Sequence, residues 1–74
     1  MITGQHATTQ QRAARIVAYL RDYSHDHGYP PTQREIAQHI GVNYSTIWHH
    51  LDRLRRAGRV TWRHRSPRSV RVTQ

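Results

Sequence analysis

Arginine is the residue type in this sequence that points most clearly to a function, and it is unevenly distributed. All 12 basic residues are Arg, and eight of them lie in residues 53–74, which contain no acid. Residues 1–52 contain four Arg and four acids, so the C-terminal segment carries the whole formal net charge of +8. Guanidinium groups pair with phosphates, and a basic block at one end of a small chain is typical of nucleic-acid binding. A basic solubilising tail is the alternative.

A helix expected at residues 44–57 presents a second set of polar side chains. Its buried stripe is expected to consist of Ile47, Leu51 and Leu54. At about 100° per residue, Ser45 and His49 then point directly away from the core. We expect these two side chains to contact base edges in the major groove, with Asn43 and Tyr44 at the entering tip of the helix.

Several neighbouring side chains on this helix have more than one interpretation. Asn43 either caps the helix or pairs with a base, and both roles can coexist. Trp48, on one shoulder of the helix, either covers the core or contacts DNA. His50 points close to the core and is expected to be a half-buried packing residue rather than a contact. Arg53 and the arginines after it are expected to contact phosphates more often than bases.

The loop at residues 64–69, which we call the wing, supplies further basic side chains. Its flanking strands are expected at residues 60–63 and 70–72, where apolar and polar residues alternate. Two arginines flank Pro67, where a rigid turn can hold guanidinium groups against phosphates or in a narrow minor groove. A solvated basic loop is the alternative. The candidate DNA contacts in this loop are Arg65, Ser66 and Arg68.

Two further helices must precede the reading helix in order to position it. The first is expected between Thr8 and Gly28, where apolar residues recur at three- and four-residue steps. The Tyr29-Pro30-Pro31 connector is expected to be extended, because proline disfavours helix in the residue before it. Thr32 and Glu35 form a capping box that begins the second, shorter helix. Thr32 and Arg34, at the start of that helix, are also candidate DNA contacts.

The resulting fold class is mainly α with a small β-hairpin, a three-helix winged helix-turn-helix. The second helix, a turn at Gly41 and the third helix form the helix-turn-helix, whose second helix enters the major groove. Residues 1–7 lack periodicity and are expected to be a disordered lead-in, whereas residues 8–74 form one domain. The longest apolar run, Ile16–Leu20, is too short for a signal peptide or a membrane span. A cytoplasmic, nucleoid-associated protein is expected.

Catalytic and metal chemistry have little support in the sequence. It contains no Cys, so disulfides, thiolate metal sites and cysteine nucleophiles are excluded. The four acids are scattered, and we expect a protein that is not an enzyme. The closest histidine pairs, His25-x-His27 and His49-His50, do not have the spacing of metal ligands beside a third donor. We therefore expect no cofactor and no metal, and histidines that face solvent or DNA.

Several segments resemble the N-terminal DNA-binding domain of LexA repressors. They are Gly28-Tyr29-Pro30-Pro31-Thr32, Arg34-Glu35-Ile36-Ala37-Gln38, His50-Leu51, and the stretch from Ser66 to Val72. The similarity covers roughly residues 10–73, and the Pro-Pro-Thr connector with the Arg-Glu-Ile-Ala sequence that follows is its most specific part. The resemblance implies a three-helix bundle with a wing, double-stranded operator DNA as the partner, and a transcriptional repressor's role.

Two departures limit what the resemblance implies. The segment from Gly41 to Leu51 is shorter than in that family, so neither the base contacts at the helix tip nor the operator sequence carries over. The family's self-cleaving peptidase domain has no counterpart here, and its Ser–Lys dyad is impossible in a sequence without Lys. A stand-alone repressor and a domain of a longer protein both stay open. The core needs every apolar stripe, so we expect a monomer in solution; pairing on a repeated DNA site stays open.

Two other classes of function use the same architecture. An excisionase-like recombination or DNA-architectural factor would use the same helix and wing, and a footprint over an attachment site rather than a promoter would reveal it. A winged helix that binds another protein would fail to bind any duplex, and the basic C-terminal segment argues against this class.

Overall fold

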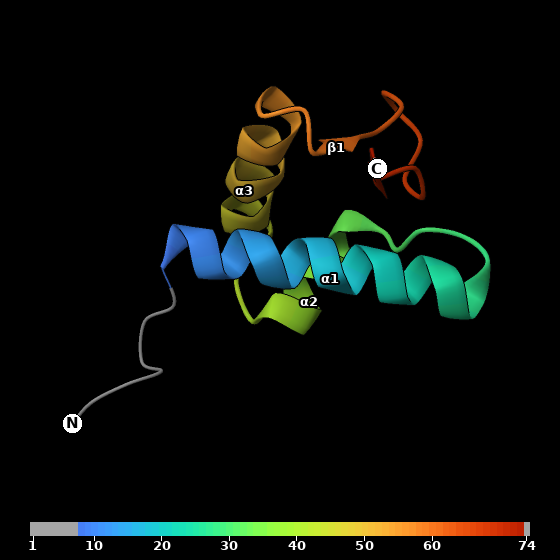
Figure 1. Cartoon of the computed structure of the whole chain (residues 1–74), viewed down its shortest axis with the longest axis horizontal. Helices are drawn as coiled ribbons and strands as arrows, with labels where there is room; N and C mark the ends of the chain where they lie inside the picture. Colours follow the sequence, from blue (N-terminus) through green and yellow to red (C-terminus); the bar gives the residue numbers. More distant parts are fainter. Residues whose placement is uncertain (1–7, 74) are drawn as a thin grey trace.

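The structure, a computed structural model, describes residues 8–73 and contains three helices followed by a hairpin. The helices are α1 (Thr9–His27), α2 (Gln33–Ile40) and α3 (Tyr44–Arg56), and the strands are β1 (Val60–Thr61) and β2 (Arg71–Val72). In Figure 1, α3 stands across the N-terminal half of α1, and the hairpin lies over the C-terminal half of α1. This order confirms the predicted winged helix-turn-helix. The lead-in expected at residues 1–7 lies outside the described residues.

The starts of the three helices are fixed by the capping residues that the sequence predicts. The Thr8 side chain accepts a hydrogen bond from the N–H of Gln11, whose side chain accepts one from the Thr8 N–H in return. Thr32 and Glu35 form the same reciprocal box at the start of α2. Asn43 Oδ1 accepts the N–H of Thr46 at 2.8 Å and begins α3. Each cap satisfies backbone donors that a helix start leaves free, so these bounds are set locally.

The end of α2 sets the turn between the two helices of the helix-turn-helix. Gly41 has φ 87°, in the left-handed region that favours glycine, and its N–H donates to the carbonyl of Ala37. Helix α3 begins at Tyr44, three residues after Gly41. It ends at Arg56 rather than at residue 57, because Ala57 acts as the C-cap and Gly58 then takes the positive φ of 75°.

The core is formed by one apolar stripe from each helix and one residue on each side of the hairpin. The residues of this core are Ile16, Val17 and Leu20 from α1, Ile36, Ala37 and Ile40 from α2, Ile47, Leu51 and Leu54 from α3, and Val60 and Val70. The predicted buried stripe of α3, Ile47, Leu51 and Leu54, is thus confirmed. In the part of the chain that the structure describes, no helix is long and apolar enough to cross a membrane.

The hairpin strands are shorter than the sequence pattern predicts. Val60 pairs with Val72 and Thr61 with Arg71 in an antiparallel register, and the ladder stops there. Side-chain hydrogen bonds replace the ladder beyond that point, because the N–H of Arg63 donates to Ser69 Oγ at 2.9 Å. The alternation of apolar and polar residues therefore predicted correctly which side chains face the core, but the strands expected from it are longer than those in the structure.

Candidate nucleic-acid interface

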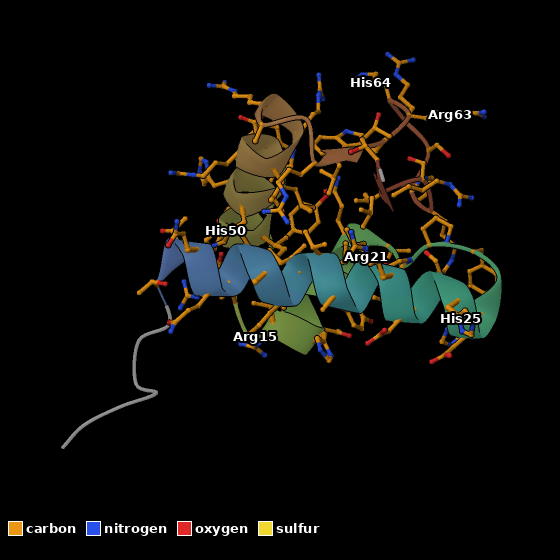
Figure 2. The ribbon with its side chains drawn as sticks, in the orientation of Figure 1. Arg15, Arg21, His25, His50, Arg63 and His64 are labelled. Carbon is orange, nitrogen blue, oxygen red and sulfur yellow. The ribbon has the colours of Figure 1, made fainter. Side chains whose placement is uncertain are left out.

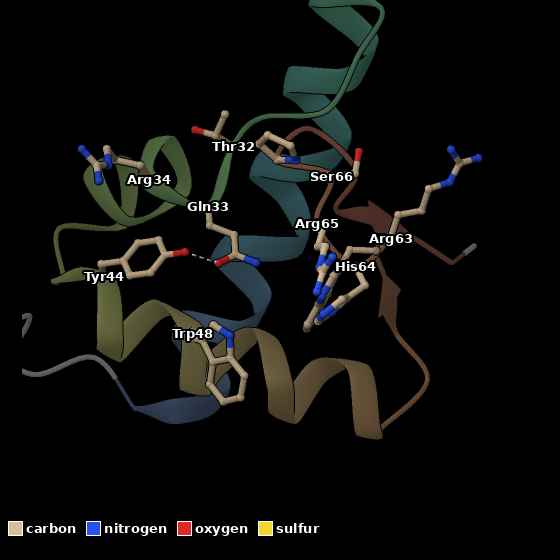
Figure 3. Close-up of a pocket in the computed structure, with 11 residues that line it drawn as sticks. Thr32, Gln33, Arg34, Tyr44, Trp48, Arg63, His64, Arg65 and Ser66 are labelled. Atoms are coloured by element: carbon tan, nitrogen blue, oxygen red, sulfur yellow. Dashed lines mark hydrogen bonds between the residues drawn. The ribbon is translucent and has the colours of Figure 1, made fainter.

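An open groove of about 620 Å³ lies between the starts of α2 and α3 on one side and the wing on the other (Figure 3). Its lining residues come from three separate parts of the chain. They are Thr32, Gln33, Arg34, Tyr44, Trp48, Trp62, Arg63, His64, Arg65, Ser66 and Pro67. The lining contains three arginines and no acidic residue. A concave, cationic surface at the start of a helix-turn-helix recognition helix is suited to the polyanionic backbone of nucleic acid.

Six of the candidate DNA contacts line this groove together. They are Thr32, Arg34, Tyr44, Trp48, Arg65 and Ser66. Four others, all on α3 or its N-cap, lie outside the lining: Asn43, Ser45, His49 and Arg53. The eleventh, Arg68, is engaged elsewhere in the protein, as described below.

The aromatic side chains on α3 face the groove instead of covering the core. Tyr44 is 53% exposed and Trp48 is 43% exposed. The Tyr44 hydroxyl donates a 2.9 Å hydrogen bond to Oε1 of Gln33, which ties the start of α2 to the start of α3 (Figure 3). Of the two interpretations of Trp48, the structure therefore supports the surface position. Exposed aromatic rings of this size on a small domain usually indicate an interaction surface.

The outward face of α3 carries the two side chains expected to read bases. Ser45 and His49 are both exposed, as the helical geometry predicts. Ser45 Oγ donates to Asn43 Oδ1 at 3.1 Å, so this side-chain oxygen accepts hydrogen bonds from both the Ser45 hydroxyl and the N–H of Thr46. The capping role of Asn43 is thus confirmed. Its amide nitrogen has no part in these bonds.

His50 lies on the opposite shoulder of α3, where the helix meets α1 (Figure 2). It is half-buried, as predicted. Burial lowers the pKa of the His50 imidazole, and the positive charges of Arg12 and Arg53 lower it further. A neutral imidazole is therefore favoured at neutral pH, consistent with a packing role.

The wing side of the groove presents its basic side chains in two directions. Arg65 and His64 project toward Trp48, whereas Arg63, at the edge of the groove, points its guanidinium away from them (Figure 3). Arg65 has φ 66°, a left-handed conformation that residues other than glycine rarely adopt. The backbone at the wing tip is therefore held in an unfavourable conformation that directs a basic side chain into the groove.

The position of Arg68 differs from the expectation of a guanidinium free to meet DNA at the wing tip. Its Nη1 and Nη2 donate to Oε1 and Oε2 of Glu35, both at 3.0 Å, in a bidentate ion pair. Nη1 also lies 3.2 Å from the Tyr23 hydroxyl and 3.2 Å from the Pro30 carbonyl. The carboxylate of the capping box is within reach of the wing, and a bidentate ion pair forms there.

Several groove residues were not singled out from the sequence as contacts. Gln33 is the first residue of α2, and its place directly after the Thr32 cap was the signal that could have identified it. Trp62 follows the short strand β1, and the Arg55 guanidinium lies 4.9 Å from the centre of its ring. Nothing in the local sequence shows that α2 and the wing share one groove, since their proximity depends on the tertiary fold. Among residues 8–73, no group of three His, Cys, Asp or Glu side chains could hold a metal ion.

Comparison with known proteins identifies the family to which the chain is similar. The family described as the LexA DNA binding domain matches residues 5–69. The chain is similar to the LexA repressor of Geotalea uraniireducens, with 38% identity over 60 residues, which are 80% of this chain and 30% of that protein. It is also similar to the LexA repressor of Lacticaseibacillus casei, with 38% identity over 66 residues, 88% of this chain and 32% of that protein.

The matches cover most of this chain but a small share of its relatives. The chain spans about a third of the length of the curated relatives it matches. The matched region contains all three helices, the turn at Gly41, strand β1 and the wing, and thus every residue that lines the groove; strand β2 lies just beyond it. By this match and by its winged helix-turn-helix, the chain belongs to the family of LexA DNA-binding domains.

Proposed function

We propose that this chain binds double-stranded DNA in a sequence-specific manner and acts as a transcriptional repressor. The observation that supports this most is the acid-free groove, in which the exposed start of a helix-turn-helix recognition helix faces a wing rich in arginine. The relatives named as LexA repressors support the repressor role. The proposed function is binding without a catalytic step. A protein with this function would act in the cytoplasm, at the nucleoid.

Helix α3 is proposed to enter the major groove with its first two turns. Ser45 and His49, on its outward face, are the proposed base contacts. Tyr44 and Trp48 line the groove beside this face, where they can pack on thymine methyl groups or contact the DNA backbone. The amide nitrogen of Asn43 is available to donate to a base, while its carbonyl oxygen caps the helix.

The remaining contacts are proposed to position the protein on the duplex without selecting its sequence. Thr32 and Arg34 at the start of α2, and Arg53 on α3, are the proposed phosphate contacts on the helical side. Arg65 and Ser66 are the proposed backbone or minor-groove contacts on the wing side. A monomer in solution is proposed, and two copies can pair on a repeated operator.

Selection of bound sites from a random DNA pool tests this proposal. We expect one sequence to be enriched, and a footprint of the protein on genomic DNA to cover a promoter. Enrichment without any preferred sequence would contradict specific reading by α3. A footprint confined to an attachment site would indicate a recombination factor with the same fold and would overturn the repressor role.

A further inference from the structure

Arg68 joins the wing to the helical body of the protein. Its guanidinium bonds to Glu35 on α2, to the hydroxyl of Tyr23 on α1 and to the carbonyl of Pro30 between those helices. It also lies 5.1 Å from the centre of the Tyr29 ring, in a cation–π contact. We call this set of interactions the clamp. Its partners lie 33 to 45 residues away from Arg68 in the sequence, so it connects parts that local structure does not.

The partner carboxylate has a second task at the start of α2. Glu35 Oε1 accepts the N–H of Thr32 at 2.9 Å, which closes the capping box, and the same oxygen accepts from Arg68. The hydrogen bonds from Arg68 lower the pKa of the Glu35 carboxyl, so the ionised form of the pair is favoured. Glu35 therefore couples the backbone at Thr32, on one side of the groove, to the wing on the other side.

The wing needs such a connection because its own hairpin is small. Two strands of two residues each form the whole ladder, and hairpins of this size are not stable alone. The bonds of Ser69 shape the loop internally, but they do not fix its angle to the helices. A bidentate guanidinium–carboxylate pair restricts both distance and orientation.

We infer that Arg68 is a positioning residue that fixes the distance between the wing and the recognition helix, and thereby the span of DNA that the protein accepts. The inference rests on the proposed DNA binding. Arg68 acts through Glu35 rather than through DNA in this account, since both terminal nitrogens of its guanidinium donate to the Glu35 carboxylate. The ion pair also has no net charge, so it adds little to the attraction for phosphates. With the clamp closed, Arg65 and Trp48 face each other across a groove of fixed width.

Three substitutions separate positioning from direct contact. Glu35→Gln keeps the capping box, because Gln also serves at this position, but it removes the charged partner of Arg68. Although it makes the protein more positive, we expect it to weaken binding of the selected duplex about tenfold. Asp22→Asn, an exposed position on α1 with the same charge change, is the matched control and should not weaken binding. The double variant Glu35→Gln with Arg68→Ala should bind no more weakly than Arg68→Ala alone.

A second measurement uses operators in which one base pair is inserted between the bases read by α3 and the flank under the wing. The wild-type protein should bind the operator with the insertion less tightly than the operator without it. Glu35→Gln and Arg68→Ala should each lose most of that discrimination. The inference would be overturned if Glu35→Gln bound as tightly as the wild type while Arg68→Ala was weakened, since Arg68 would then contact DNA itself. Unchanged affinity and unchanged discrimination in both variants would also overturn it.

Free protein provides a test that does not depend on DNA. If the wild type binds no duplex, the proposed function fails, and the clamp is then judged by nuclear relaxation of the wing amides. These should become more mobile in Glu35→Gln than in Asp22→Asn, and equal mobility would refute the clamp. Arg68→Lys, which keeps the charge but cannot bond in bidentate fashion, replaces Arg68→Ala should that variant fail to fold, and it should show the same loss of binding.

Discussion

The helix-turn-helix and the hairpin form opposite sides of one groove, yet they are held in place by different interactions. Residues 33–56 form two capped helices, each of which buries three apolar side chains in the core. Residues 60–72 form a ladder of two residue pairs with two buried valines. Beyond the ladder, side-chain hydrogen bonds of Ser69 and Arg68 hold the loop.

This difference means that one side of the groove contributes to the stability of the fold, whereas the other side can change its position. The recognition helix is part of the core, so its position cannot change without loss of the fold. The wing is anchored to the core by Val60 and Val70 at its base, whereas its tip is held by polar contacts at the surface, so the position of the tip can change while the core stays intact. We therefore expect substitutions on the two sides of the groove to be distinguishable by whether the free energy of unfolding or the affinity for DNA changes more.

The largest effect is expected from truncation of the core side of α3. Ile47 is fully buried, and Ile47→Ala should lower the free energy of unfolding by about 2–5 kcal/mol, from lost burial and the cavity left behind. Denaturant unfolding measures this, with the exposed Gln38→Ala on α2 as a control expected within about 0.5 kcal/mol of the wild type. If both variants were equally stable, α3 would not be anchored as described.

The next largest effect concerns the opposite face of the same helix. Ser45→Ala and His49→Ala should leave unfolding nearly unchanged, because both side chains are exposed. Each should cost about 1–3 kcal/mol of affinity for the selected duplex and much less for random DNA. Fluorescence titration of both duplexes checks this. Equal losses on the two duplexes would show that these residues contact only the backbone.

A smaller effect separates the two roles of Asn43. Asn43→Ala should lower the free energy of unfolding by about 1 kcal/mol, because the N–H of Thr46 loses its cap. Asn43→Ser keeps a capping oxygen but removes the amide nitrogen. A weaker complex of the Ser variant with the selected duplex, at unchanged stability, would reveal a base contact. An unchanged complex would leave Asn43 with the capping role alone.

The smallest effect is the acid sensitivity of the connection between the two sides of the groove. The pKa of the Glu35 carboxyl is lowered from its ordinary value near 4.5 by the hydrogen bonds from Arg68, so the folded state holds its proton more weakly than the unfolded state. The stabilisation is fully present above the ordinary value and is lost as the pH falls through the lowered one. Thermal unfolding between neutral and acid pH should show this loss in the wild type, and Glu35→Gln should lack it. Parallel pH profiles of the two proteins would contradict the assignment.

The sequence was sufficient where structure is determined locally. The caps at Thr8, Thr32 and Asn43 each depend on residues within three positions, and the apolar stripes follow directly from helical geometry. The left-handed turn at Gly41 was likewise predictable from the residue type. These features define the helix-turn-helix almost completely.

The groove and the wing were less predictable because they depend on contacts between distant segments. Arg68 and Glu35 are 33 residues apart, and no local pattern distinguishes a paired arginine from a free one. The bond between Tyr44 and Gln33 and the exposure of Trp48 depend on how α2 packs beside α3. Periodicity also could not show that side-chain bonds of Ser69 would replace the strand ladder beyond Thr61.

Affinity for the selected duplex and for a random duplex, measured across a series of salt concentrations, tests the central claim most directly. If about six phosphates are contacted, log affinity should fall against log salt with a slope near −5. At each salt concentration the selected duplex should bind about a thousandfold more tightly than the random one, or more. Equal affinities for the two duplexes, or affinities that do not respond to salt, would contradict sequence-specific DNA binding by this groove.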